Sequence, residues 1–287
     1  MKSQLEAFKE YIRLKLKPAT NTISVISGKG GVGKTNFVAN LGLILNNFGL
    51  KVLLVDFDLG LSNLDILLNM GSNERRFNLA HYLEGKVSLE QIITRSKYGV
   101  DIIIGALGDE KVVNMNSVER DKLLAQLDNI ISEYNFVILD MGAGIAENTI
   151  KLSLCADNIV LITTPEPHAL LSAYGTLKVL KDKLSQQSVF LVVNNVKNKL
   201  EGDKLQNGFI DTVYKYLNII VEPLGNILYD PQVVSSVKEK IPFVINYPTG
   251  WASECLNAIA TRMCTKLGVN ITLKKRSFFS KLFKSFL

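Results

Sequence analysis

The chain has 287 residues, 47% of them hydrophobic, which is enough to bury a full core, and we expect one large domain. Its formal net charge is +6, but five basic residues and no acid lie in residues 274–287, so the remainder is nearly neutral and a general nucleic-acid surface is not expected. The N-terminus has no apolar signal-peptide core, and the widely spaced Cys155, Cys255 and Cys264 predict free thiols, so we do not expect secretion. No run of about 18 apolar residues occurs, so we do not expect a membrane span.

Short apolar runs alternate with helical patterns along most of the chain. The runs predict strands at 22–27, 51–56, 100–104, 135–140, 158–163, 188–194 and 224–228. Helical periodicity predicts helices near 34–48, 62–69, 117–133, 167–184, 203–217 and 251–267. Several runs lack polar alternation, which is typical of strands covered on both faces. The order predicts an α/β fold class, a doubly wound, mainly parallel sheet that binds its ligand at the carboxyl ends of the strands.

The run GKGGVGKT at residues 28–35 directly follows the first predicted strand. Strand, glycine-rich loop and helix come in the order of a P-loop, whose backbone N–H groups and helix N-terminus hold the β- and γ-phosphates of a nucleotide. In that geometry Gly33 lets the backbone approach the phosphates, Lys34 neutralises their charge, and the Thr35 hydroxyl ligates Mg²⁺. The residues expected to bind ATP or GTP in this loop are Gly28, Gly30, Gly31, Val32, Gly33, Lys34 and Thr35.

Carboxylates follow two predicted strands near this loop. Asp56 and Asp58 end one strand, and Asp140 ends the buried strand 135–140 in a Walker B pattern. One such carboxylate can organise the metal shell while another orients a water, and Asp140 would hold the water ligands of the metal. A helix cap or loop role is the alternative for the Asp56 and Asp58 pair. We expect these strand ends to converge on the γ-phosphate.

The run GKGGVGKT resembles the deviant Walker A motif of the MinD/ParA ATPases. In that family the early lysine reaches across a dimer interface to the partner's nucleotide, so the resemblance implies a catalytic role for Lys29 and an ATP-bound homodimer. From the residues alone, Lys29 could equally be a solvated loop lysine. DFDLGLSNLD at residues 56–65 resembles the switch I region of the MinD branch, in which the second Asp positions the attacking water. The resemblance therefore implies that Asp58 is catalytic and that Asp56, with Thr35 and Asp140, supports Mg²⁺.

Asn194 ends the predicted strand 188–194 and resembles the adenine-contacting Asn of the family, which favours ATP over GTP. A turn residue is the alternative. Guanine readers place an N/T-K-x-D motif directly after a late strand. The run NKLE at residues 198–201 is displaced from the strand end and carries Glu, so we interpret it as a coincidence.

Three runs resemble one branch of the family more narrowly. DLGLSNLDILLN, MGAGIAENT and TTPEP, at residues 58–69, 141–149 and 163–167, are similar to FlhG, the branch of flagellar-number regulators also called FleN or YlxH. Met141 departs from the Thr or Ser common in that branch. Residues 3–9 approximate a DQAxxLR-like element that stimulates the GTPase FlhF, so the resemblance implies FlhF and flagellar basal-body components as partners. The alternatives are a MinD-type division-site regulator and, less favoured, a ParA-type DNA-partitioning module.

The last residues form a segregated helical pattern at about 100° per residue. Its polar side carries lysines and serines, and its apolar side carries Phe278, Phe279, Leu282, Phe283, Phe286 and Leu287. Such a helix suits an anionic membrane surface, and two tails on an ATP-bound dimer would gain about 10²–10⁴ in avidity. A terminal helix packed on the protein's own core is the alternative.

The expected organisation therefore has three parts. An N-terminal helix covers residues 1–18, a P-loop ATPase domain covers 19–273, and an amphipathic membrane-targeting helix covers 274–287. The N-terminal helix could also pack on the body. We expect a cytoplasmic protein that associates peripherally with the inner face of the cell membrane.

Overall fold

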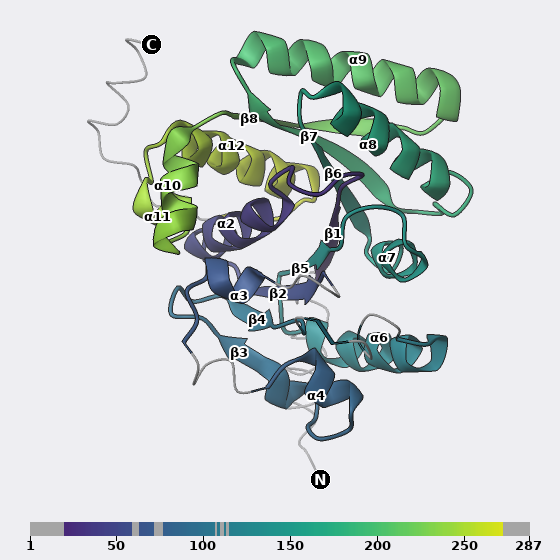
Figure 1. Ribbon diagram of the computed structural model, residues 1–287, viewed down its shortest axis with the longest axis vertical. Helices are drawn as coiled ribbons and strands as arrows, with labels where there is room; N and C mark the ends of the chain where they lie inside the picture. Colours follow the sequence, from purple (N-terminus) through teal and green to yellow (C-terminus); the bar gives the residue numbers. More distant parts are fainter. Residues whose placement is uncertain are drawn as a thin grey trace, which may run out of the picture.

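The computed structural model describes residues 20–58, 63–71, 77–106, 108–109, 112 and 115–271. Within these residues an eight-stranded sheet carries helices on both faces (Figure 1). The helices predicted for residues 1–18 and 274–287 lie outside the described residues. No helix in the described part of the chain is long and apolar enough to cross a membrane.

The sheet has the strand order β3-β4-β2-β5-β1-β6-β7-β8. Every pairing is parallel except that between β3 and β4. The strands are β1 Asn21–Ile26, β2 Val52–Phe57, β3 Ile93–Arg95, β4 Asp101–Ile103, β5 Phe136–Met141, β6 Asn158–Thr163, β7 Ser188–Val196 and β8 Val221–Leu228. The predicted doubly wound, mainly parallel sheet is confirmed, and only the short edge strand β3 was missing from the prediction.

Two layers of helices cover the sheet (Figure 1). One layer contains α2 Lys34–Asn47, α3 Leu64–Leu67, α10 Pro231–Glu239, α11 Phe243–Asn246 and α12 Trp251–Lys266. The other contains α4 Leu79–Leu83, α6 Ser117–Ile131, α7 Glu147–Ser153, α8 Pro167–Leu180 and α9 Lys199–Leu217, with the 3₁₀ turn η1 Glu90–Ile92. Successive residues of a strand contribute to opposite layers: Val52 and Leu54 pack in the first cluster, and Leu53 and Val55 in the second.

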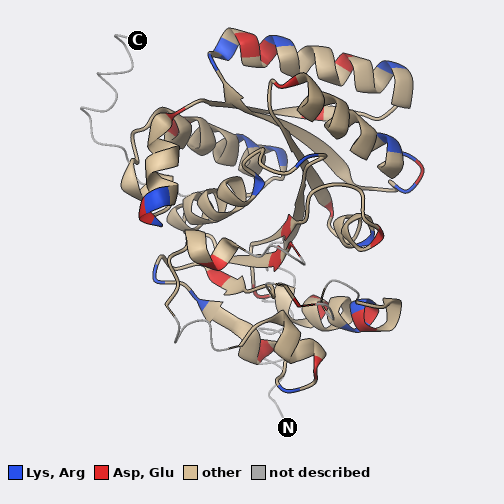
Figure 2. Ribbon diagram, in the orientation of Figure 1, with Lys and Arg blue, Asp and Glu red and all other residues tan. Residues whose placement is uncertain are grey.

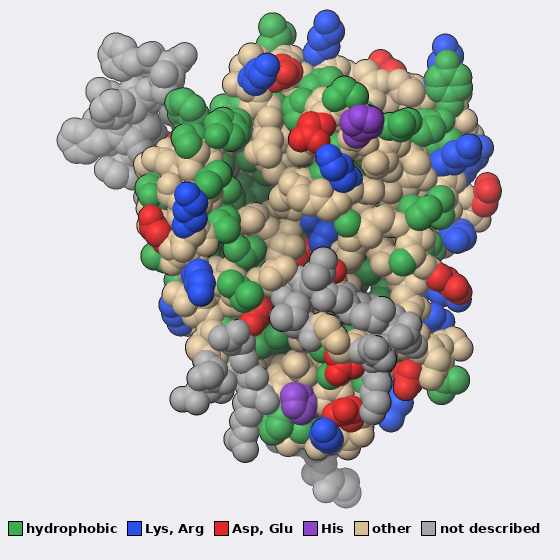
Figure 3. Space-filling model, viewed as in Figure 1, with side chains coloured by type: hydrophobic (Ala, Val, Ile, Leu, Met, Phe, Trp, Pro, Cys, Tyr) green, Lys and Arg blue, Asp and Glu red, His purple; other side chains and the backbone are tan. Residues whose placement is uncertain are grey.

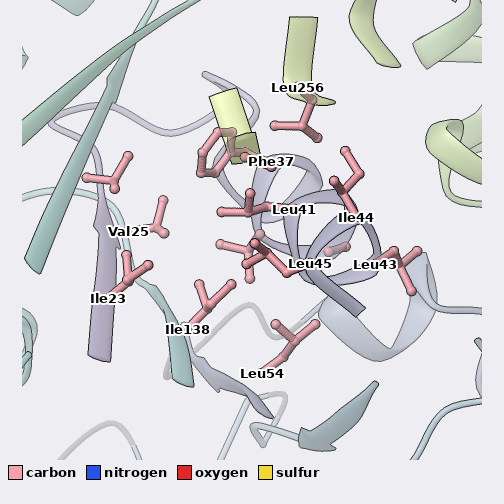
Figure 4. Packing of buried hydrophobic residues seen from close by; sticks show 14 of the residues in the cluster. Ile23, Val25, Phe37, Leu41, Leu43, Ile44, Leu45, Leu54, Ile138 and Leu256 are labelled. Atoms are coloured by element: carbon pink, nitrogen blue, oxygen red, sulfur yellow. The ribbon is translucent and has the colours of Figure 1, made fainter. Parts of the chain in front are cut away.

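Helix α2 is the centre of the first layer. Its side chains Leu41 and Leu45 are buried on the side of β1, β2 and β5, whereas Phe37 is buried near Leu256 of α12 (Figure 4). Gly42 allows this close packing, because a Cβ atom there would lie 2.8 Å from the Leu54 side chain. The helix that begins at the P-loop is therefore fixed against the three central strands.

The strand register brings the predicted site residues to one edge of the sheet. Asp140 in β5 lies beside Val25 of β1 on one side and beside Asp56 of β2 on the other. The loop after β1 leaves the sheet at this edge, between β5 and β6. Ligands of doubly wound sheets bind at such carboxyl edges.

Candidate nucleotide site

The P-loop occupies residues 27–33, between β1 and α2. Gly31 and Gly33 have φ angles of +79° and +92°, a backbone conformation that L side chains rarely adopt. Gly28 touches α8, because a Cβ atom on it would lie 2.2 Å from backbone atoms of Ser172. Gly31 and Gly33 therefore allow the backbone turn of the loop, and Gly28 allows the loop to pack closely against α8.

Asn194 at the end of β7 supports the loop from a second side. Its Nδ2 donates a hydrogen bond of 2.8 Å to the Val32 carbonyl oxygen. A Cβ atom on Gly33 would lie 2.4 Å from the same nitrogen and would disturb this hydrogen bond, and the φ of +92° disfavours other residues there. Beside Asn194 is a cavity of about 400 Å³ that shares Gly33 with the loop and is lined largely by apolar side chains, among them Phe37 and Phe243. An aromatic base in this cavity would contact apolar side chains next to the loop.

Lys34 and Asp140 form a buried ion pair beneath the loop. The Lys34 Nζ is 2.7 Å from Asp140 Oδ1, and the two side chains are only 7% and 0% exposed. Burial raises the pKa of Asp140, an effect opposed by Lys34 and by the Thr35 hydroxyl and reinforced slightly by Asp58. Asp140 Oδ2 is also buried and has no hydrogen-bond partner among the described residues.

The unpartnered Asp140 oxygen and the Thr35 hydroxyl fit a hard cation. Mg²⁺ prefers oxygen ligands and usually keeps several waters, with substrate phosphates completing its shell. Among the described residues, no cluster of three or more histidine, cysteine or acidic side chains could hold a metal alone. The donor set therefore fits a Mg²⁺ ion that arrives with a nucleotide rather than a resident metal.

The two carboxylates after β2 have different surroundings. Asp56 is fully buried, and its carboxylate accepts hydrogen bonds from the backbone N–H groups of Asp58 and Leu64 at 3.0 and 3.3 Å. Asp58 is half-buried and lines a cavity of about 720 Å³ together with the P-loop. Asp56 thus holds the backbone around Asp58, and its support of a metal stays a prediction.

Lys29 lies on the outer side of the loop. Its Nζ is 2.8 Å from Glu166 Oε2, at side-chain exposures of 47% and 63%. This contact lowers the pKa of Glu166, chiefly through the hydrogen bond and then through charge attraction. Exposed ion pairs of this kind are weak and exchange readily, so the Lys29 ammonium can move to another anion.

Several residues that border the 720 Å³ cavity were not among the site residues predicted from the sequence. They are Asn63, Ile66, Leu67, Gly142, Ala143, Ala146, Asn148, Thr149 and Val237. Most of them lie in the segments that follow β2 and Asp140. The ends of these two strands, and the glycines after Asp140, were the sequence signals that could have indicated them. Val237 of α10 carried no such signal.

Comparison with known proteins agrees with this geometry. A family model described as "AAA domain" matches residues 20–191. The septum site-determining protein MinD complexed with Mg-ADP, from Pyrococcus horikoshii, superposes with a TM-score of 0.74 at 27% sequence identity, covering 87% of this chain and 98% of that one. The chain belongs to the MinD/ParA family of AAA-domain proteins.

Two of the curated relatives carry names of the flagellar branch, FleN and YlxH. The antiactivator FleN of Pseudomonas aeruginosa is 29% identical over 84% of this chain and 85% of its own length. The flagellum site-determining protein YlxH of Helicobacter pylori is 29% identical over 93% of this chain and 91% of its own length. The resemblance of this MinD/ParA protein to flagellar regulators, inferred from three short runs, is therefore confirmed over most of the chain.

The contact of the P-loop with α8 gives a stability prediction. Gly28→Ala forces a methyl group against the Ser172 backbone, and we expect the free energy of unfolding to fall by about 1–3 kcal/mol. Gly30→Ala is the matched control, because a Cβ atom there meets nothing within 4 Å, and its change should stay within about 0.5 kcal/mol. Urea unfolding without nucleotide measures both, and equal stabilities of the two variants would contradict the close contact.

Proposed function

We propose that this protein hydrolyses ATP as a switch that controls where and how many flagella assemble. The observation that carries the ATPase part is the convergence of Lys34, Thr35 and Asp58 on one cavity, above the buried Asp140. The flagellar part is supported by the similarity to FleN and YlxH over most of the chain.

Each residue has a definite task in this proposal. The P-loop N–H groups and Lys34 bind the phosphates, and Thr35 and Asp140 would hold Mg²⁺, with Asp56 behind them. The ion, when bound, would neutralise charge that develops on the β- and γ-phosphate oxygens. Asp58 orients the attacking water from the cavity wall.

ATP is the proposed nucleotide rather than GTP. Asn194 commits its Nδ2 to the Val32 carbonyl, whereas its Oδ1 has no partner among the described residues. A free amide oxygen accepts a hydrogen bond, so it can take one from the amino group of adenine. Guanine also has N–H donors, and the choice against GTP rests on the run NKLE at residues 198–201, which carries Glu where guanine readers carry Asp. The largely apolar cavity beside Asn194 would take the base.

A homodimer with its two nucleotide sites face to face is the proposed active state. Ile66, Ile145 and Val237 are large apolar side chains 38–56% exposed at or beside the mouth of the cavity. Exposed apolar residues around a site are typical of a surface that becomes covered. Because Lys29 is on the outer side of the loop in a weak ion pair, its ammonium is available to a nucleotide in the other subunit.

Removal of the Asp58 carboxylate tests the catalytic part. Asp58→Ala should still bind ATP and dimerise, because the P-loop is unchanged, but hydrolysis should be slower by about 10²-fold or more. Asp211→Ala, on the exposed side of α9, is the control and should hydrolyse ATP at the wild-type rate. Phosphate release measures both, and wild-type turnover by the Asp58 variant would remove Asp58 from this role.

Membrane association through residues 277–287 is part of the proposal and lies outside the described residues. A chain lacking these residues should dimerise with ATP and hydrolyse it, because it keeps the P-loop, Asp58 and Asp140. Its ATP-dependent sedimentation with anionic liposomes should be lost. Persistent liposome binding would mean that the membrane contact lies elsewhere.

The cellular role is tested by deleting the gene and imaging whole cells. We expect altered flagellar number or placement with normal division sites, restored by the wild-type gene and not by the Asp58→Ala gene. Minicells or misplaced septa with normal flagella would assign the same switch to division-site placement. A DNA-partitioning role is less favoured, because basic and acidic residues are intermixed over the described elements (Figure 2).

A further inference from the structure

Gly142, just after Asp140, lies between two polar groups of the cavity wall. A Cβ atom built on Gly142 would be 3.5 Å from Asp58 Oδ1 and 3.6 Å from Thr149 Oγ1. All three residues line the same cavity as the P-loop. The carboxylate and the hydroxyl therefore border one small space that glycine leaves open.

The Thr149 hydroxyl is available for a ligand. It makes no hydrogen bond to the part of the chain that the structure describes, and Thr149 is half-buried. The neighbouring cavity residue Asn148 has both ends of its amide engaged, with Nδ2 donating to the Met115 carbonyl oxygen and Oδ1 accepting from Arg120. Among these two polar side chains of α7, Thr149 is the one free to bind a water.

The position of Thr149 is fixed by packing. Helix α7 buries Ile150 and Leu152 in the second core cluster, and the Thr149 carbonyl oxygen accepts a hydrogen bond from Ser153 Oγ at 2.5 Å. Asn148 joins the same helix to the chain before α6 through the Met115 carbonyl oxygen at 3.1 Å. Asp58 leaves the sheet at the end of β2, so the two groups reach Gly142 from independently anchored elements.

We propose that Thr149 is a second water-positioning residue, and that its hydroxyl and the Asp58 carboxylate together hold the attacking water over Gly142. The inference rests on the proposed ATP hydrolysis and adds a residue to it. A water has two protons to donate, and Asp58 and Thr149 each supply an acceptor oxygen. With both protons held, a lone pair of the water is directed away from the wall, toward a phosphate bound at the P-loop.

The reaction then proceeds as an in-line displacement. The water oxygen forms a bond to the γ-phosphorus, and the bond from that phosphorus to the β,γ-bridging oxygen breaks with its electron pair leaving on ADP. One water proton stays on inorganic phosphate and the other passes to solvent. Thr149 is not consumed and carries no charge, so its contribution is orientation.

Filling the space above Gly142 is the first test. Gly142→Ala should fold normally, because the added methyl group meets its neighbours at 3.5–4.0 Å, which is ordinary van der Waals contact. The methyl group takes the place of the water, so we expect the hydrolysis rate to fall about tenfold or more while affinity for a fluorescent ATP analogue stays within about twofold. Gly208→Ala, in open space on the exposed side of α9, should change neither quantity.

Substitution of Thr149 is the second test. Thr149→Val keeps the shape without the hydroxyl and should lower kcat about tenfold with KM nearly unchanged, whereas Thr149→Ser should restore most of the rate. A purely structural role would lower the melting temperature and would not depend on the hydroxyl. Wild-type kcat in Thr149→Val, whatever the rate of Gly142→Ala, would overturn the inference.

The results distinguish a wrong role for Thr149 from a wrong proposed function. If Asp58→Ala is slow and Thr149→Val is as fast as the wild type, only the role of Thr149 is wrong. If the purified wild-type protein hydrolyses no ATP with Mg²⁺ and anionic liposomes present, the proposed function and the inference are both wrong.

Discussion

The buried ion pair between Lys34 and Asp140 is the interaction on which the rest of the site depends. Burying two charges away from water costs desolvation free energy, which is offset only when the two groups are held close together in good geometry. Here β5 pairs with β1 so that Asp140 lies beside Val25, and α2 starts directly after Gly33, so Lys34 comes from its first turn. The pair therefore exists only where strand, loop and helix are all in place. Removal of either charge would leave the other buried and uncompensated.

The shape of the loop above this pair depends on elements distant in sequence. Gly28 packs on α8, Asn194 of β7 binds the Val32 carbonyl oxygen, and Glu166 before α8 binds Lys29. A nucleotide that draws the loop inward would change contacts to α8 at two points. A change at the phosphates can therefore reach the helical layer that includes α8 and α9 (Figure 1) through these contacts. The exposed apolar side chains around α10 lie in the other layer (Figure 3).

The sequence alone predicted the parts of the fold that have strong local signals. Seven strands were predicted because buried parallel strands are continuous apolar runs, and the P-loop because its glycines and lysine have fixed spacing. Short elements such as β3 and α7 were missed, since they are shorter than the window of about 11–18 residues over which periodicity is read. The contacts of Asp56 with the backbone, and the proximity of Thr149 to Asp58 across Gly142, depend on how separate strand ends meet, which no local pattern encodes.

The most direct test of the site is equilibrium binding of a fluorescent ATP analogue with Mg²⁺ to the wild-type protein and to Lys34→Met. Met keeps most of the side-chain volume and removes the charge that would meet the phosphates. We expect saturable binding by the wild type and at least about a tenfold loss of affinity in the variant, with circular dichroism confirming that both are folded. Undiminished affinity in a folded Lys34→Met protein would contradict the assignment of this loop as the nucleotide site.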